Sequence, residues 1–189
     1  MRESRSNIAY NMMEKHQLRK TLLAMRRAMP PDEKAWRDKA IAERLAAWLE
    51  ENPAASIGLY WPTQGEPDLT GVYSLLADRG IRLALPVVVG RDAPLAFHPW
   101  RPGDALAADA HGVMAPAQRG APVRPELLAI PCVGFNAQGY RLGYGGGYYD
   151  RTLAVEAPPR TVGIAYAACE AVFAANAHDV MMGTIITER

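Results

Sequence analysis

One short segment near the C-terminus carries the residue types that bind a metal ion and a phosphate group. It runs from Arg141 to Arg151 and has four glycines in five positions, followed by two tyrosines and an aspartate. Glycines let backbone N–H groups approach a ligand closely, and a helix N-terminus behind them favours an anion. Arg141 can hold phosphate oxygens bidentately, and Asp150 is the hard oxygen ligand that magnesium prefers. The combination predicts a metal–phosphate site.

Glycine richness alone does not identify such a site, because many tight turns share it. The segment lacks the Gly-Lys-Ser/Thr ending of a P-loop, and Tyr148 occupies the third glycine position of a dinucleotide fingerprint. A nicotinamide-dependent dehydrogenase is disfavoured for that reason, and because no strand–glycine–helix unit occurs early in the chain. The cation, carboxylate and aromatic rings within eleven residues separate this segment from a structural turn.

Two other groups of polar residues have both a structural and a functional interpretation. Lys15, Arg19 and Arg26 are spaced by four and seven residues, which places them on one helical face. A basic stripe of this kind is most often a solvated surface. Glu66 lies between a glycine and a proline, a composition typical of an exposed turn. The residues alone leave both interpretations open.

The N-terminal part of the chain predicts a pair of helices. Asn11 and Glu14 have the spacing of an N-cap residue and its partner, so we expect the first helix to begin there and residues 1–10 to form a flexible tail. A Pro-Pro pair separates this helix from a second one that ends at Asn52. An apolar stripe at helical period runs along the first helix: Leu18, Leu22, Met25 and Met29.

Strands and helices then alternate, a pattern typical of a mainly parallel sheet covered on both faces. We expect one three-layer α/β domain over residues 11–189, with a central sheet flanked by helices. Pro86 is expected to interrupt the second strand, and residues 101–125 to be mostly loop. The predicted strands cover residues 56–61, 81–89, 95–100, 127–135, 161–165 and 184–187, and the predicted helices cover residues 68–78, closed by Gly80, and 147–155.

The composition excludes several classes of protein. At 189 residues, 49% hydrophobic and 22% charged, the chain suits one globular core and is unlike a disordered protein. A net charge of +1 gives no support for nucleic acid or a membrane surface as partner, and we expect no signal peptide or membrane span. Cys132 and Cys169 cannot form a disulfide framework, which fits a cytoplasmic location. We expect a monomer, and the four histidines lack metal-ligand spacing.

The glycine segment resembles the signature of the 5-formyltetrahydrofolate cyclo-ligase family, and it reads here Arg-Leu-Gly-Tyr-Gly-Gly-Gly-Tyr-Tyr-Asp-Arg. The resemblance covers nearly the whole chain and includes Lys15-x-x-x-Arg19, the Glu66 turn and residues 178–188 in the family's order. It implies an enzyme that converts 5-formyltetrahydrofolate to 5,10-methenyltetrahydrofolate. The implied reaction uses ATP and magnesium, passes through a phosphorylated formyl group (an iminium phosphate), and releases ADP and phosphate.

The resemblance also assigns roles to single residues. Tyr148 and Arg141 are implied in catalysis, Tyr148 beside the reacting formyl group, and Asp150 in holding magnesium. Arg141 is expected to face the ligand rather than the core. The residues implied in ATP binding are Lys15, Arg19, Arg141, Leu142, Gly143, Tyr144, Gly145, Gly146, Gly147, Tyr148 and Tyr149. Those implied in folate binding are Trp61, Glu66, Tyr144, Gly145, Gly146, Gly147 and Tyr148, with Trp100 either stacked on the pterin ring or simply packed.

Three positions depart from the family pattern. Gly183 stands where relatives commonly carry an acidic second magnesium ligand, Ala115 where they often carry glutamate, and Cys132 where glycine is usual. In an active enzyme, Asp179 or water would replace the acid missing at Gly183. The same departure leaves a second interpretation open, a non-catalytic folate- or nucleotide-binding protein of the same fold.

Overall fold

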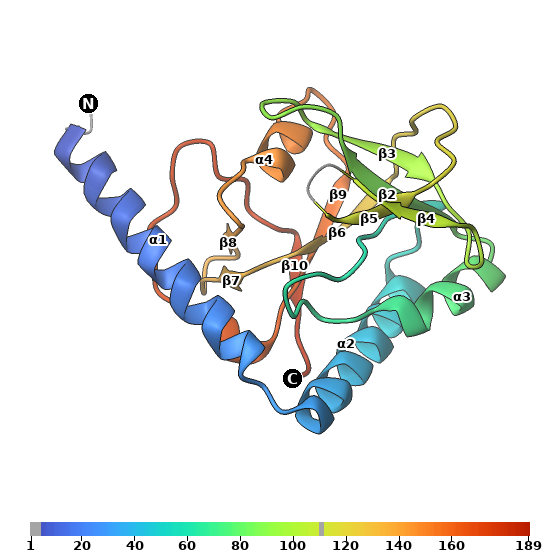
Figure 1. Ribbon diagram of the computed structural model, residues 1–189, viewed down its shortest axis with the longest axis horizontal. Coiled ribbons are helices and arrows are strands. Elements are labelled where there is room, and N and C mark those ends of the chain that lie inside the picture. The colour runs from blue at the N-terminus through green and yellow to red at the C-terminus, as the bar shows by residue number, and fades with distance from the viewer. Residues whose placement is uncertain (1–4, 110–111) are drawn as a thin grey trace.

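The computed structural model describes residues 5–109 and 112–189, with side chains described from Met13 onward. A six-stranded sheet forms its centre (Figure 1). The strands are β1 (Ser56–Gly58), β2 (Arg82–Val88), β3 (Leu95–Pro99), β6 (Leu127–Pro131), β9 (Arg160–Ile164) and β10 (Thr184–Ile186). They lie in the order β10-β9-β6-β1-β2-β3, and all neighbouring pairs are parallel except β2 and β3. The predicted mainly parallel sheet is confirmed.

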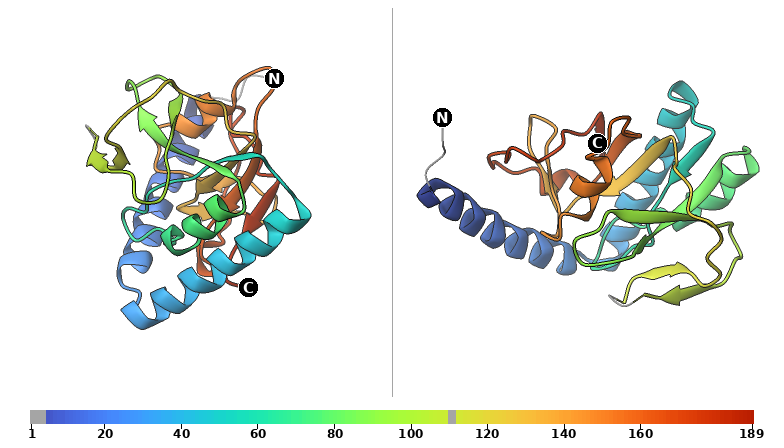
Figure 2. Two further views of the ribbon diagram at one scale, coloured as in Figure 1. Left: turned by 90° about the vertical axis from the view of Figure 1, so that its right-hand side faces the viewer. Right: turned by 90° about the horizontal axis from the view of Figure 1, so that it is seen from above.

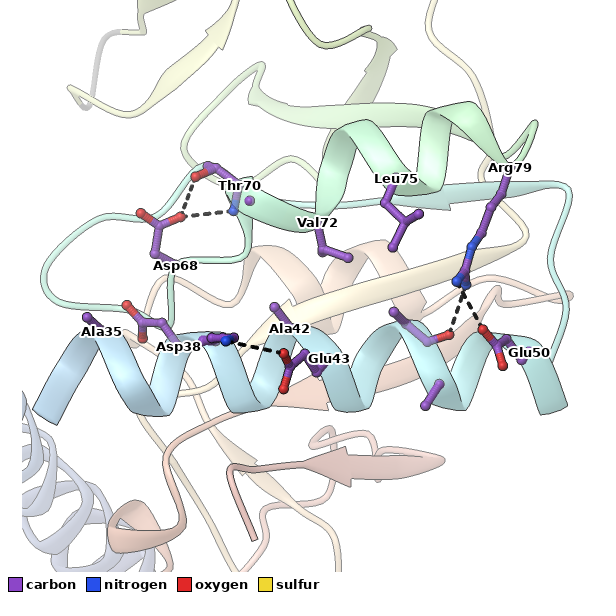
Figure 3. Close-up of a pocket in the computed structure, with 14 residues that line it drawn as sticks. Ala35, Asp38, Ala42, Glu43, Glu50, Asp68, Thr70, Val72, Leu75 and Arg79 are labelled. Atoms are coloured by element: carbon purple, nitrogen blue, oxygen red, sulfur yellow. Dashed lines mark hydrogen bonds and ion pairs between the residues drawn. The ribbon is translucent and has the colours of Figure 1, made fainter.

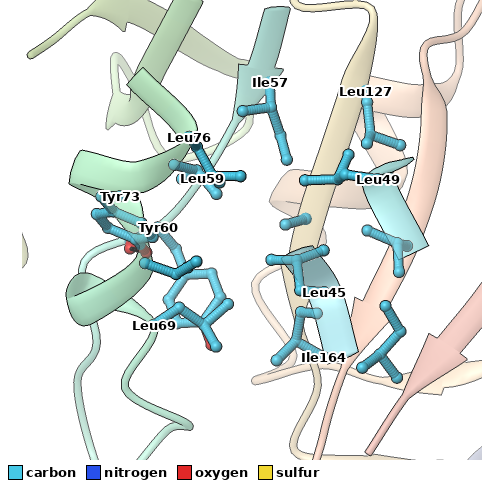
Figure 4. Close-up of a cluster of buried hydrophobic side chains, with 14 of the residues drawn as sticks. Leu45, Leu49, Ile57, Leu59, Tyr60, Leu69, Tyr73, Leu76, Leu127 and Ile164 are labelled. Atoms are coloured by element: carbon cyan, nitrogen blue, oxygen red, sulfur yellow. Dashed lines mark hydrogen bonds between the residues drawn. The ribbon is translucent and has the colours of Figure 1, made fainter. Parts of the chain in front are cut away.

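Helices cover both faces of this sheet. The helices of the described residues are α1 (Arg5–Arg27), α2 (Pro31–Glu51), α3 (Thr70–Asp78), α4 (Tyr148–Leu153) and the short 3-10 helix η1 (Ala167–Cys169), and α2, α3 and α4 are those that cover the sheet. On one face, α2 and α3 pack with Leu127 of β6 in the largest apolar cluster (Figure 4). On the other face, Leu153 of α4 packs with Leu128. Successive strand residues point to opposite faces, so the three-layer arrangement is confirmed.

The first helix lies at the side of the molecule rather than on the sheet (Figure 2). It packs along an antiparallel pair of short strands, β7 (Gly134–Phe135) and β8 (Arg141–Leu142), which follow the end of β6. Leu22 of α1 packs there with Val133 and Leu142. This contact brings α1 beside the glycine segment, which begins in β8.

The predicted start of α1 is wrong. The helix begins at Arg5 instead of Asn11, because neither proline nor glycine lies between them to break it. Of the predicted flexible tail, residues 1–4 lie outside the described residues and residues 5–10 are helical. The second helix agrees better with its prediction: α2 begins at the Pro-Pro pair and has Asn52 as its C-cap.

The burial of the apolar and the basic stripe of α1 differs from what their composition suggests. Met25, a member of the apolar stripe, is 37% exposed, whereas Lys15 and Arg26 of the basic stripe are 5% and 2% exposed. The spacing placed these residues correctly on common faces, but it did not indicate which face meets the protein. Both stripes meet the protein, since Leu22 of the apolar stripe is buried as well.

Pro86 lies inside β2 and does not interrupt it. The strand pairs with β1 only from Arg82 to Ala84, whereas it pairs with β3 from Ala84 to Val88. Beyond Ala84, β2 therefore has a strand neighbour on one side only, where Pro86 is in register with Phe97. A proline lacks an N–H, and it is tolerated at a strand edge of this kind.

Several predicted elements are divided or shortened in the structure, and one predicted loop contains strands. The predicted loop 101–125 contains an antiparallel pair, β4 (Leu106–Ala108) and β5 (Met114–Pro116). The predicted strand 127–135 is divided into β6 and β7, and both β1 and α4 are shorter than expected. Gly80 follows α3 with a φ of 82°, as predicted for its end. Among the described residues, no helix is long and apolar enough to cross a membrane.

Gly134 determines how closely α1 approaches β7. A Cβ atom at Gly134 would lie 2.6 Å from Leu22 Cδ1 and 2.9 Å from the carbonyl oxygen of Cys169. Because the backbone oxygen cannot rotate away, we expect Gly134→Ala to lower the free energy of unfolding by about 2 kcal/mol. Gly71→Ala is the matched control, since nothing lies within 4 Å of a Cβ there and alanine favours a helix. Urea unfolding followed by circular dichroism measures both; equal midpoints would contradict the prediction.

Candidate active site

The glycine loop, residues 143–147, connects β8 to α4 and has a shape that demands glycine. Gly145 and Gly147 have φ angles of 99° and 68°, which other residues rarely adopt. A Cβ atom at Gly146 would lie 2.8 Å from the ring of Tyr148. Three of the four glycines are therefore required by the local backbone or by the neighbouring ring.

One cation of α1 lies against this loop, and a second pairs with Asp179. Arg19 Nε donates to the carbonyl oxygen of Gly143 at 2.7 Å, and the guanidinium lies beside Gly145. Lys15 Nζ donates to Asp179 Oδ2 at 2.7 Å, and only 6% of the lysine side chain is exposed. Burial lowers the pKa of Arg19, and the charge of Asp179 opposes that shift. The solvated-surface interpretation of the basic stripe is therefore wrong.

Arg141 is held by the protein at the start of the glycine loop. Its Nη1 donates to the carbonyl oxygen of Val180 at 3.0 Å, and its Nη2 pairs with the carboxylate of Asp150. Arg141 is 7% exposed, whereas the side chain of Asp150 is 35% exposed. The expectation that Arg141 avoids the core is corrected: the residue is buried and links β8 to α4 and to residue 180.

Glu66 is a buried residue of a tight turn. It is 3% exposed, its N–H donates to the carbonyl oxygen of Thr63, and its Oε2 accepts the Thr63 N–H at 2.9 Å. Burial raises the pKa of Glu66, and hydrogen bonds from Tyr144 and Thr63, together with the charge of Arg26, oppose this rise. The exposed-turn interpretation of Glu66 is wrong.

The hydroxyl of Tyr144 joins the Glu66 turn to the glycine loop. It donates to Glu66 Oε1 at 2.7 Å and accepts a hydrogen bond from Arg26 Nη2 at 2.8 Å. Arg26 also donates to the carbonyl oxygens of Cys132 at 3.3 Å and Gln64 at 2.9 Å. Four segments that are distant in the sequence therefore meet at one guanidinium and one hydroxyl.

No role was expected for Arg26. The only signal of its importance was its position on the same helical face as Lys15 and Arg19. That face bears three cations: Lys15 pairs with Asp179, and Arg19 and Arg26 donate to two neighbouring residues of the glycine loop, Gly143 and Tyr144.

The two tryptophans expected near the folate pack on each other. Trp61 and Trp100 meet edge to face, with ring centroids 5.8 Å apart. Trp100 is 5% exposed and its indole N–H donates to the carbonyl oxygen of Asp104 at 3.2 Å, so it has the packed role. Trp61 is half-buried and retains an accessible side. In the glycine segment, the guanidinium of Arg151 lies 5.1 Å from the ring centroid of Tyr148.

Two surface grooves differ in their relation to these residues. A groove of about 660 Å³ lies between α2 and α3, and none of the predicted site residues lines it (Figure 3). A second groove, of about 540 Å³, runs along α1 and is lined by Lys15, Leu18 and Phe173 among others. The second groove therefore adjoins the predicted phosphate site, and the first does not.

The carboxylates of this region fit a magnesium ion that is completed by other ligands. Across the described ranges, no cluster of three or more His, Cys, Asp or Glu residues is arranged to hold a metal. Magnesium is commonly bound by one or two carboxylates with substrate phosphates and water; Asp150 is partly exposed, but in this structure its carboxylate pairs with Arg141. Asp179, considered as a second ligand, pairs with Lys15 instead. At Gly183 a Cβ would lie 3.0 Å from the carbonyl oxygen of Thr161, so the site is crowded.

The structure thus brings a glycine loop, buried cations and a buried carboxylate together beside an open α/β sheet. The family model of the 5-formyltetrahydrofolate cyclo-ligases matches residues 11–188. The chain belongs to this family and is a ligase, as the resemblance of the glycine segment implied.

Known relatives match the chain over nearly its full length. It is 32% identical to the 5-formyltetrahydrofolate cyclo-ligase of Mycoplasma pneumoniae, over 93% of this chain and 99% of the relative. It is 31% identical to the protein of that name from Mycolicibacterium smegmatis, over 93% of this chain and 94% of the relative. The solved structure of Aquifex aeolicus 5,10-methenyltetrahydrofolate synthetase aligns with a TM-score of 0.79 at 31% identity, over 93% of this chain and 90% of that one. These matches confirm the α/β fold.

Proposed function

We propose that this enzyme converts 5-formyltetrahydrofolate to 5,10-methenyltetrahydrofolate, with ATP as co-substrate and magnesium as cofactor. The observation that carries the proposal is the 2.7 Å hydrogen bond from Tyr144 of the glycine loop to the buried carboxylate of Glu66. The loop side of this contact offers backbone N–H groups and cations to a triphosphate. The other side offers a carboxylate to the N–H groups of a reduced folate, so the two ligands would lie next to each other.

The chemistry requires a formyl oxygen to become a good leaving group. Transfer of the γ-phosphoryl group of ATP to this oxygen forms an iminium phosphate and releases ADP. The side-arm nitrogen of the folate then attacks the formyl carbon and loses its proton, and the carbon–oxygen bond breaks as inorganic phosphate leaves. The protein supplies no covalent group in this sequence. Its contribution is positioning and electrostatic stabilisation.

Lys15, Arg19 and Arg141 are the cations that we propose for the phosphates, together with backbone N–H groups of residues 142–149. Each cation has a protein oxygen as its partner in the structure, so nucleotide binding would exchange these partners for phosphate oxygens. Asp150 would then hold magnesium, which neutralises charge on the phosphates when bound. Arg141, with its planar guanidinium, would stabilise the transferring phosphoryl group.

The folate side of the site would be formed by Glu66, Trp61 and the residues of the glycine loop. Glu66 is already oriented, because Thr63 and Tyr144 each donate to one of its oxygens. The remaining lone pairs of its carboxylate can accept hydrogen bonds from the folate. Tyr148, which follows the loop directly, is proposed to lie nearest the formyl group.

Turnover separates this proposal from the alternative of a non-catalytic folate- or nucleotide-binding protein, which Gly183 favours. We expect ADP release that depends on 5-formyltetrahydrofolate and matches the folate consumed, measured by a coupled ADP assay and chromatography of the folates. Binding of both ligands in calorimetry without folate-dependent ADP release would favour the binding protein.

We further propose that the enzyme acts as a monomer in the cytoplasm, with small molecules as its partners. Cys132 and Cys169 are buried free thiols, which suits a reducing compartment. Sedimentation analysis at assay concentration tests the monomer directly, and a stable dimer would contradict it.

The raised pKa of Glu66 predicts an acid limb in the pH profile. Burial places the pKa of this carboxyl above its ordinary value of 4.5, so protonation removes the proposed folate acceptor at a higher pH than for an exposed glutamate. We expect kcat/KM for 5-formyltetrahydrofolate to fall as the pH decreases through this raised pKa, because kcat/KM reports groups of the free enzyme.

Glu66→Gln is the control for this acid limb. In Glu66→Gln the amide does not titrate, so the same limb should be absent; its persistence would assign the limb to another group. A raised folded-state pKa means that the stabilising contribution of Glu66 is fully present below pH 4.5 and is lost as the pH rises through the folded-state value. Stability and folate affinity should therefore change in opposite directions over this window.

A further inference from the structure

Arg26 is buried in a way that packing alone does not require. It is 2% exposed, and burying a guanidinium costs free energy unless its N–H groups are paired. Its Nη atoms donate to acceptors from three segments, the carbonyl oxygens of Cys132 and Gln64 and the hydroxyl of Tyr144. Its Nε, which is also buried, has no partner among the described protein atoms. An apolar side chain would avoid these costs, so the charge is retained for the groups that it orients.

The donors around Tyr144 fix the direction of the whole hydrogen-bond chain. A guanidinium can only donate, so the Tyr144 oxygen accepts from Arg26 and its own hydrogen is directed at Glu66 Oε1. The backbone N–H of Thr63 likewise can only donate, to Glu66 Oε2. Both oxygens of Glu66 therefore have to accept. An amide would place an N–H against one of these donors, so the two hydrogen bonds favour a carboxyl group held in one orientation.

We propose that Arg26 is a positioning residue for the folate site, acting on Glu66 through the hydroxyl of Tyr144. This inference rests on the proposed function. Arg26 and Glu66 form no ion pair within 4.0 Å in the described structure, so Tyr144 is the link between them. Tyr144 belongs to the glycine loop. The same link therefore fixes the position of the Glu66 carboxylate, which is proposed to bind the folate, relative to the proposed phosphate-binding loop.

The link can be broken at its middle with little change of shape. Tyr144→Phe removes the hydroxyl but keeps the ring, which faces the Arg26 guanidinium at 5.8 Å. Arg26→Lys keeps the charge but not the forked geometry that reaches three acceptors. Arg27→Lys is the matched control, because Arg27 is exposed, neighbours Arg26 and, among the described residues, has the Gln64 side chain at 3.2 Å as its side-chain hydrogen-bond partner.

The test is a double-mutant cycle on the KM values for both substrates, with thermal midpoints measured alongside. We expect Arg26→Lys and Tyr144→Phe each to raise the KM for 5-formyltetrahydrofolate about tenfold, with the KM for ATP unchanged. The KM of the double variant for 5-formyltetrahydrofolate should exceed that of Tyr144→Phe by no more than about twofold, because both changes break the same link. Arg27→Lys should leave both KM values unchanged.

Additive effects in the cycle would overturn the inference, since Arg26 would then act independently of Tyr144. A lowered thermal midpoint with an unchanged folate KM would also overturn it, by making Arg26 merely structural. If Arg26→Lys fails to fold, Tyr144→Phe alone decides: an unchanged folate KM contradicts the link. A wild-type protein that converts no folate overturns the proposed function and the inference together, whereas an active wild type with additive variants overturns the inference alone.

Discussion

Replacing Arg141 with alanine should reduce turnover by about a hundred- to a thousandfold, because a fixed donor at developing charge is worth about 3–4 kcal/mol in the transition state. The guanidinium lies at the start of the glycine loop and is oriented by the Asp150 carboxylate and the carbonyl oxygen of Val180. The KM of the Arg141→Ala variant for ATP should rise as well. Steady-state kinetics at saturating folate measures both quantities.

The buried position of Arg141 makes a stability control necessary. Its removal leaves Asp150, which is 35% exposed and can be hydrated, so the loss of folding stability should be about 1–2 kcal/mol. Arg160→Ala is the control for activity: it also removes an arginine that donates to a backbone carbonyl, that of Pro53, but an exposed one at the start of β9. It should retain full turnover. A folded Arg141→Ala protein with unchanged kinetics would contradict the phosphate role.

Replacing Glu66 with alanine should weaken folate binding by about a hundredfold and leave ATP binding intact. The variant would lose two charge-assisted hydrogen bonds from the folate to the carboxylate, each worth about 1.5–3 kcal/mol. The cost of burying the charge lowers this gain. The carboxylate is 3% exposed and both of its oxygens are oriented. Alanine would leave both of these donors without their acceptor. Calorimetric titration with each ligand separately measures the two affinities.

The control for Glu66 is another glutamate that accepts a backbone N–H. Glu126 Oε2 accepts the N–H of Ala55 at 3.0 Å, away from the glycine loop. Glu126→Ala should therefore affect stability slightly and neither ligand affinity. Equal losses of folate and ATP binding in Glu66→Ala would show that the assignment of the two sides of the site is wrong.

Local sequence patterns predicted the α/β fold well, because the signals for a helix or strand lie within the element itself. The Pro-Pro pair before α2 and Gly80 after α3 act on the backbone at their own positions. Pro86 shows the limit of this approach. Its effect depends on whether a neighbouring strand needs its N–H, and the end of β1 at Gly58 is not visible from residues 81–89.

The site was predictable in its composition but not in its burial. Helical spacing placed Lys15, Arg19 and Arg26 on one face, yet spacing carries no information about which face packs against the protein. Glu66 illustrates the same point, because a tight turn has one composition whether it is exposed or covered by another segment. What covers Glu66 is Tyr144, which is distant in the sequence. The family resemblance of the glycine segment supplied the chemical class, and the tertiary structure supplied the role of Arg26.

The central claim is that this protein closes the folate ring at the expense of ATP. Its most direct test is the near-ultraviolet absorbance of the methenyl product, followed after the purified wild-type protein is mixed with 5-formyltetrahydrofolate, ATP and magnesium. We predict a rise that requires all three components and that stops when the metal is chelated. No rise under these conditions, with folate and ATP both bound, would contradict the claim.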